Sequence, residues 1–291
     1  MGTIGMILTY STPAVIAAAA LEAVVLSLAG RQRYDWRAYF ASLADLLTRD
    51  YIINVYLTFG LALPLATLAW QHRLTTVPLG TAGAIFVLFL GQEFAYYWFH
   101  RCSHRIRWLW ASHAVHHSPN QLNLSAAYRI GWTGRLAGGN VFYVPLIWFG
   151  FPPRAVFTTL SLNLLYQFIL HATWIPKLGP FEWVLDTPSH HRVHHATNPD
   201  YLDKNYGGVL IVFDRLFGTF AAERADEPCR YGLVVPLRSN NPVRIAFHEW
   251  LAVGRELRRA RGWRERARLV FGPPGHAPTN AAPILAPLPA E

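Results

Sequence analysis

The sequence is short of charged residues and of cysteine, and both shortages narrow the class of protein. Only 15% of its 291 residues are charged, whereas 52% are hydrophobic and 14% are aromatic. An ordinary soluble domain carries about 25% charged residues. The two cysteines, Cys102 and Cys229, are too few and too poorly placed for a disulfide framework. The composition therefore indicates a membrane protein and excludes a disulfide-stabilised scaffold.

Lysine is almost absent. Two of the 26 basic residues are lysine, so the net charge of +9 comes from arginine. The arginines lie beside apolar stretches, so we expect them to meet anionic lipid headgroups, and we expect no nucleic acid partner. An excess of arginine hints at a GC-rich genome. It favours a bacterial inner membrane, with a eukaryotic endoplasmic reticulum as the alternative.

Three long apolar runs predict an all-α, polytopic membrane bundle. Each is long enough to cross a hydrocarbon core of about 30 Å, and they cover residues 6–28, 52–70 (with a kink at Pro64) and 80–99. No basic residue precedes the first run, so we expect a retained anchor. Its Glu22 is expected at headgroup depth near the helix end, or alternatively on a substrate path. The basic loop 30–50, with an amphipathic helix expected over 36–47, marks the cytoplasmic side, so the third run delivers His100 to that side.

A fourth apolar stretch, residues 141–171, is interrupted by the sequence Gly150-Phe-Pro-Pro. Its two arms would be about 16 and 26 Å long as helices. We therefore predict a membrane hairpin that returns His171 to the depth of the other histidines. The chain then divides into N-terminal spans, a histidine-rich region with a cytoplasmic helical cap, a basic amphipathic helix at the membrane surface and a disordered tail. These parts cover residues 1–99, 100–250, 251–271 and 272–291.

Histidine is concentrated in two short windows. HRCSH (100–104) and HAVHH (113–117) make up the first, and HHRVHH (190–195) repeats the HxxHH spacing about eighty residues later. Helical residues four apart share a face, so we expect clamps of imidazoles, one formed by His100 with His104 and one by His113, His116 and His117 on a single face. A lone histidine such as His72 is usually a plain surface or core residue. Nine grouped imidazoles would repel one another when charged, whereas a metal takes up their lone pairs. The predicted ligands are His100, His104, His113, His116, His117, His171, His191, His194 and His195.

A shell made only of nitrogen suits two metal ions better than one structural zinc, which usually has cysteine ligands. Soluble di-iron bundles use ExxH pairs, and this chain has none. Iron is compatible with the pattern, while zinc and manganese stay open. Three residues are candidates for supporting the ligands. His190 points away from the shared face, Asp214 accepts an imidazole N–H or pairs with an arginine, and Asn123 supports a ligand or caps a helix.

Three strings resemble the fatty acid hydroxylase/sterol desaturase superfamily of membrane di-iron oxygenases. They are EFAYYWFHRCSH (93–104), LWASHAVHHSPNQLNLSAAYR (109–129) and TPSHHRVHHATNPDYLDKNYGGVLIVFDRLFGTF (187–220). Their wording is most similar to the alkylglycerol monooxygenase family, except that Arg105 follows the second histidine where that family reads HRxxHE. The resemblance implies two iron ions, the histidines above as catalytic ligands, and residues 100–250 as the catalytic region. It also implies O2-dependent hydroxylation, desaturation or ether cleavage of a lipid or sterol-like substrate.

Electrons for such a reaction would come from outside this sequence. It contains no GxGxxG loop, no CxxC and no recognisable haem-binding domain. A reductase, a cytochrome or another electron-transfer protein is one expected donor, and the resemblance makes tetrahydropterin another. Two other functions stay open, a divalent-metal transporter and a membrane protein that stores metal. A transporter would need ligands through the bilayer midplane, whereas these histidines gather at one face.

Overall fold

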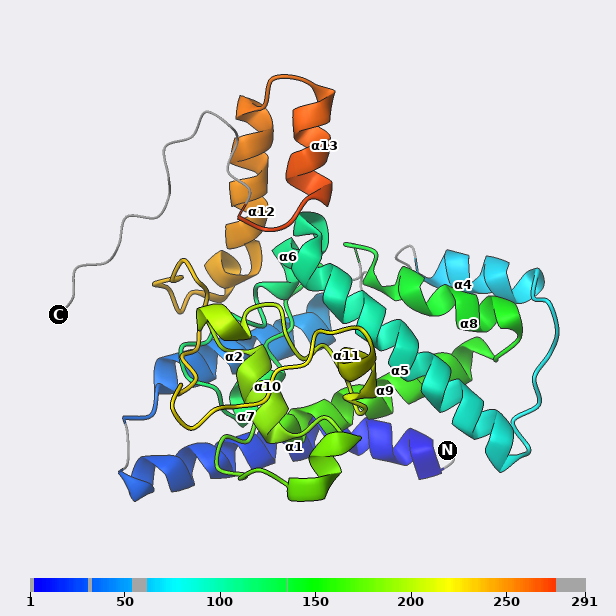
Figure 1. The fold of residues 1–291 in the computed structure, drawn as a ribbon, viewed down its shortest axis with the longest axis horizontal. Helices are drawn as coiled ribbons and strands as arrows, with labels where there is room; N and C mark the ends of the chain where they lie inside the picture. Colours follow the sequence, from blue (N-terminus) through cyan, green and yellow to red (C-terminus); the bar gives the residue numbers. More distant parts are fainter. Residues whose placement is uncertain (1–2, 31–32, 54–61, 135, 276–291) are drawn as a thin grey trace.

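The structure is a computed structural model that describes residues 3–30, 33–53, 62–134 and 136–275 (Figure 1). The regular secondary structure of these ranges is helical, with loops between the helices, and they contain no β-strand, only isolated bridges at Leu185–Leu210 and Ala196–Tyr231. The all-α prediction is therefore confirmed for the described part of the chain.

The N-terminal part consists of α1 (Thr3–Ala29) and α2 (Trp36–Thr48), followed by a π-helical turn, η1 (Arg49–Ile53). Helix α2 begins where the Asp35 carboxylate accepts the Ala38 N–H, which satisfies one of the free donors of the first turn. Its apolar face packs against α1 in a core that includes Ala19, Ala23 and Leu46. The amphipathic helix expected over 36–47 is thus present.

Two helices of the described chain are long and apolar enough to cross a membrane, Ser11–Ala29 within α1 and Ala82–Arg105, which is α5. At about 1.5 Å per residue α5 is about 36 Å long. The second expected span is described only as α4 (Ala62–Gln71), because residues 54–61 lie outside the described residues. Three spans therefore stay a prediction.

The stretch 141–171 contains the predicted break. A 3-10 turn, η2 (Gly139–Tyr143), leads into α8 (Val144–Phe149), and α9 (Pro153–Leu170) follows. Between them Gly150 has φ 119°, and a Cβ there would collide with the Thr75 carbonyl, so glycine is required. Helices α4, α5, α8 and α9 pack around a common apolar core. The insertion of this hairpin into a membrane stays a prediction.

The cap is made of short helices and loops. They are α6 (Arg107–His113), α7 (Leu124–Ala127), η3 (Gly179–Trp183), α10 (Pro188–His194), η4 (Pro199–Tyr201) and α11 (Val212–Leu216). Helix α10 contacts α9, and Figure 1 shows it among the loops of the cap.

The arginine-rich segment differs from the single helix expected over 251–271. It forms two helices, α12 (Pro242–Arg259) and α13 (Trp263–Phe271), which project together from the body in Figure 1. The chain leaves the helix at Ala260, where the backbone becomes extended, and Gly262, with φ 108°, is the N-cap of α13. Arg107 of α6 anchors the pair through Glu249 and Glu256 of α12. Residues 276–291 of the expected tail lie outside the described residues.

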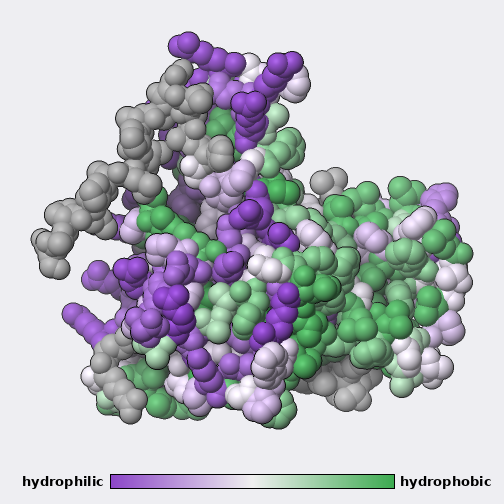
Figure 2. Space-filling view, in the orientation of Figure 1, coloured by the Kyte–Doolittle hydropathy of each residue, from purple (hydrophilic) through white to green (hydrophobic). Residues whose placement is uncertain are grey.

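Apolar side chains gather on one part of the surface. Figure 2 shows them over α4, α8 and the adjoining half of α5, whereas most of the polar side chains lie over the cap and on the α12–α13 pair, which also presents apolar side chains. On α5 the exposed residues include Ile85, Phe86 and Val87, each more than half exposed. An apolar surface of this kind is suited to lipid and indicates a membrane protein.

Candidate metal centre

Nine histidines, six of them from the cap, meet in two groups, and in each group the candidate ligand nitrogens all lie within 4.8 Å of one another. Eight are buried, and His113 is half-buried. Site A contains His100, His104, His113, His117 and His194, and site B contains His116, His171, His191 and His195. All nine histidines expected as ligands are therefore brought together.

The two HxxHH strings are each shared between the sites. In the first, His113 and His117 belong to site A while His116 belongs to site B. The second is divided the other way, since His194 belongs to site A and His191 and His195 to site B. The expectation that His113, His116 and His117 all serve one face was therefore wrong. The first string is not one helical face, because α6 ends at His113 and the other two histidines lie in the turn that follows. In each string the two histidines four residues apart share a site, and the one between them belongs to the other site.

Four of the imidazoles are held by backbone carbonyls. The Nδ1 atoms of His100, His116, His171 and His194 lie 3.0, 3.1, 2.9 and 2.9 Å from the carbonyl oxygens of Tyr206, Arg129, Gln167 and Lys204. A carbonyl oxygen only accepts hydrogen bonds, so each of these Nδ1 atoms carries the proton. Their Nε2 atoms therefore keep the lone pair that a metal ligand needs.

The remaining nitrogens point at one another. The Nε2 atom of His113 lies 3.1 Å from that of His100, and the Nε2 atoms of His171 and His191 are 3.2 Å apart. The buried Nε2 atoms of His104 and His194 have no hydrogen-bond partner among the described residues. Converging lone pairs in a buried space are unfavourable unless a cation takes them up. These residues therefore fit a pair of metal ions.

Burial also keeps these imidazoles neutral. Loss of hydration lowers the pKa of His116 to about 4, and proximity to His194 acts in the same direction. Burial likewise lowers the pKa of His194 to about 4. Near neutral pH both rings are therefore uncharged, as metal coordination requires.

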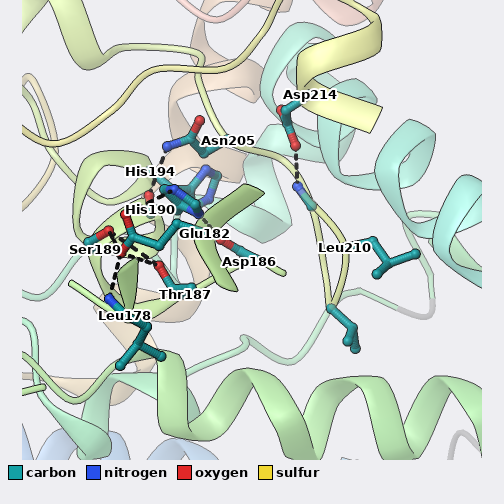
Figure 3. A network of polar contacts seen from close by, with 12 residues as sticks. Leu178, Glu182, Asp186, Thr187, Ser189, His190, His194, Asn205, Leu210 and Asp214 are labelled. Carbon is teal, nitrogen blue, oxygen red and sulfur yellow. Dashed lines mark hydrogen bonds and ion pairs between the residues drawn. The ribbon is translucent and has the colours of Figure 1, made fainter. Parts of the chain in front are cut away.

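The three supporting candidates occupy different places. His190 points away from both sites and lies between Glu182 and Asp186, with nitrogen to carboxylate distances of 3.8 and 3.7 Å (Figure 3). Asn123 caps α7 by accepting the Ser125 N–H, as the capping alternative expected. His72 lies at the end of α4, outside both sites.

Asp214 makes no hydrogen bond or ion pair with an imidazole of the described residues. Its fully buried carboxylate accepts hydrogen bonds from the backbone N–H groups of Tyr206 and Gly207 and from the Thr219 hydroxyl, each at 2.7 Å. It therefore fixes the loop whose Tyr206 carbonyl holds His100. From the sequence, Asp214 was expected to accept an imidazole N–H or to pair with an arginine. The carboxylate instead accepts hydrogen bonds from backbone N–H groups and a hydroxyl.

Sequence reasoning overlooked a buried polar network between α5 and α9. Glu93 accepts hydrogen bonds from Asn163 and from the N–H groups of Val209 and Leu210. Asn163 in turn accepts from Gln167, and Gln167 accepts from the Tyr96 hydroxyl. An acid inside the third apolar run was the signal that could have revealed it.

Glu22 has partners that the sequence did not reveal. Its carboxylate is buried and accepts hydrogen bonds from the Leu124 N–H and the Trp174 indole, at 2.7 and 2.9 Å. It therefore joins α1 to the cap. These partners lie more than a hundred residues away in the chain, while the placement of Glu22 at headgroup depth or on a substrate path stays a prediction.

Arg105, the residue that departs from the HRxxHE pattern, pairs with Asp203. The guanidinium lies 2.7 Å from one Asp203 oxygen, and the other oxygen lies 3.8 Å from Nδ1 of His104. A carboxylate thus stands beside His104, supplied by another segment of the chain.

The part of the chain that holds sites A and B is similar to known proteins. Residues 85–219 match the sequence model of the fatty acid hydroxylase family. The chain is 40% identical to human alkylglycerol monooxygenase over 210 residues, which is 72% of this chain and 46% of that protein. It is 38% identical to the alkylglycerol monooxygenase of Xenopus tropicalis, again over 72% of this chain and 46% of the relative.

A bacterial lipid hydroxylase is also similar. The ornithine lipid hydroxylase of Rhizobium tropici is 30% identical over 128 residues, which is 44% of this chain and 39% of that protein. The chain spans about half the length of the alkylglycerol monooxygenases it matches. No solved structure matches it. The resemblance read from the histidine strings is confirmed.

Proposed function

We propose that this chain, which belongs to the fatty acid hydroxylase family over its histidine-rich region, is a membrane-bound di-iron oxygenase that oxidises a lipid or sterol-like substrate with O2. The observation that carries the proposal is the pair of all-histidine sites, A and B, that share both HxxHH strings. The names of its relatives, which are lipid hydroxylases and monooxygenases, support the same reaction class.

Two adjacent sites favour a joint reaction over two independent structural metals. The rings of His117 in site A and His195 in site B stack with their centroids 4.4 Å apart. When bound there, two iron ions would supply the reduction of O2 and the oxidation of an unactivated C–H bond. The chain itself holds neutral imidazoles in fixed tautomers and keeps bulk water from the site by burial.

The chain is proposed to cross the membrane several times, with α1, α5, the segment ending in α4, and the α8–α9 hairpin inserted. The exposed apolar side chains on α1 and α5 support this arrangement, because no buried partner covers them among the described residues. The cap would then lie on the cytoplasmic side by the distribution of arginine, and a bacterial inner membrane is the proposed location.

The substrate proposal follows from the relatives. Hydroxylation of a carbon next to an ether oxygen would give ether cleavage, the reaction suggested by the alkylglycerol monooxygenase names. Hydroxylation elsewhere on a lipid chain, or its desaturation, would use the same pair of metal sites. An external reductase, a cytochrome or tetrahydropterin would supply the electrons, since the sequence has no nucleotide loop of its own.

The test begins with anaerobically purified, iron-loaded protein in lipid nanodiscs, which is reduced with dithionite. O2 uptake is then measured when this protein is exposed to O2 in the presence of mixed lipid extracts. Lipid-dependent O2 uptake with an oxygenated lipid product supports the oxygenase. A double variant, H194A with H195A, controls for reduced iron in solution. Tightly held zinc, or iron without lipid-dependent O2 uptake, would instead support metal storage, and metal uptake into proteoliposomes would support a transporter.

A further inference from the structure

One histidine in site A is linked to a buried carboxylate through a single peptide group. His100 donates from Nδ1 to the Tyr206 carbonyl oxygen at 3.0 Å. The N–H of the same peptide, on Gly207, donates to Oδ2 of Asp214 at 2.7 Å. The order is therefore carboxylate, peptide N–H, peptide carbonyl and imidazole, with the Nε2 lone pair of the imidazole facing site A.

The same arrangement occurs once in site B. His116 donates from Nδ1 to the Arg129 carbonyl oxygen at 3.1 Å, and the N–H of that peptide, on Ile130, donates to Oδ2 of Asp45 at 3.1 Å. Asp45 and Asp214 are 1% and 0% exposed, so water does not compete for either carboxylate. Asp45 comes from α2 and Asp214 from α11, and the two aspartates share no segment.

We propose that Asp214 and Asp45 are positioning residues that act through one peptide group each, and that they strengthen His100 and His116 as ligands of sites A and B. A negative charge at a peptide N–H polarises the group and makes its carbonyl a stronger acceptor. A stronger acceptor at Nδ1 fixes the ring and raises the basicity of Nε2, as a direct carboxylate does in many metal sites.

Two other carbonyl-bound histidines lack this support. His194 donates to the Lys204 carbonyl, but the N–H of that peptide, on Asn205, donates to the neutral carbonyl of Thr219. His171 donates to the Gln167 carbonyl, whose peptide lies inside α9. Among the four carbonyl-bound histidines, each site thus has one histidine with carboxylate support and one without it.

Asp45 offers the sharper test, because only one of its two carboxylate oxygens accepts hydrogen bonds. Oδ2 takes the N–H groups of both Ile130 and Gly131, while Oδ1 has no hydrogen-bond partner among the described residues. Asp45→Asn can therefore keep both hydrogen bonds while it removes the charge, with the amide NH2 in the place of the unpartnered Oδ1. Asp214 uses both oxygens, so Asp214→Asn removes the charge and also one acceptor. Arg129 lies near Asp45 and loses a nearby negative charge in the first variant, a change that Asp214→Asn does not make.

Glu22 provides the matched control. Its buried carboxylate also accepts a backbone N–H, that of Leu124, but the carbonyl of that peptide, on Asn123, accepts from Ala126 and not from a histidine. Glu22→Gln therefore removes a buried charge of the same kind without touching the support of a ligand.

In the experiment, the detergent-solubilised parent and each variant are titrated with Fe(II) enriched in the Mössbauer isotope of iron. Mössbauer spectra of the reduced protein are recorded at pH 8. We expect Asp45→Asn to change the spectrum of one iron and weaken its binding about tenfold. Asp214→Asn should change the other iron, and Glu22→Gln neither. If the parent binds two irons and the Asp45→Asn spectrum is the same as that of Glu22→Gln, the inference is wrong but the two-metal centre stands. Loss of both irons in Asp45→Asn would also overturn only the inference. The inference rests on the proposed two-metal centre, and a parent that binds no iron would overturn that centre and the inference with it.

Discussion

Sites A and B are built from the same two strings but differ in number of ligands and in surroundings. Site A has five histidines, one of them half-buried, and lies beside the Arg105–Asp203 ion pair. Site B has four, all buried, and depends on His171 at the end of α9. Because fewer protein ligands leave more coordination positions open, site B is the better candidate for binding an exogenous group. The comparison shows that one repeated histidine spacing can produce two unequal sites when packing places the histidines of each string in different sites.

The largest expected effect comes from His171→Ala. Site B would keep three histidines, and none of the other described residues in the group could replace the lost nitrogen. We expect loss of the site B iron and of turnover, with site A still loaded, measured as iron per chain and product formed. Full turnover with two irons bound would place His171 outside the centre.

Acidification should affect both sites of the metal-free protein. Burial lowers the pKa of His116 in site B and of His194 in site A to about 4, below the unfolded value of 6.5. A lowered pKa means that the folded state binds fewer protons than the unfolded state. The free energy of unfolding should therefore fall as pH falls from about 6.5 toward 4. Thermal unfolding of metal-free protein across this range checks it, and a flat profile would contradict the burial of neutral imidazoles.

A smaller effect is expected from His113→Ala. His113 is the half-buried member of site A, and four other histidines remain there. The site should still bind iron, but the Mössbauer spectrum of that iron should change and turnover should fall without being abolished. If His113→Ala removes site A iron as completely as His171→Ala removes that of site B, the sites are more alike than proposed.

The smallest effect is expected from Arg105→Gln. Its ion pair with Asp203 is largely exposed, and pairs of this kind contribute about 1 kcal/mol or less. The free energy of unfolding should change little, with any spectral change limited to site A, since Asp203 lies near His104. His72→Ala serves as the control with no expected change in metal content or spectrum. A change in site B on Arg105→Gln would contradict the assigned surroundings.

Much of this centre could be predicted from local spacing. The string HRCSH, the two HxxHH strings and the break at Gly150 pointed to the nine histidines that meet here, because such features depend on residues near one another in sequence. The division between the sites could not be predicted, since it depends on how α5, α9 and α10 pack. The roles of Glu93, Asp45 and Glu22 were missed for the same reason, as their partners are distant in the chain. The break between α12 and α13, at the extended Ala260 and at Gly262, was not predicted either.

The central claim is that neighbouring residues of one string serve different metal sites. His194 and His195 are adjacent on α10 and its C-cap, yet belong to site A and site B. The most direct test is the iron content and reduced Mössbauer spectrum of His194→Ala and His195→Ala, purified alongside the parent. The account predicts about two irons per chain in the parent and, in each variant, a disturbance confined to one iron, with a different iron affected in each. The same iron disturbed in both variants would contradict it.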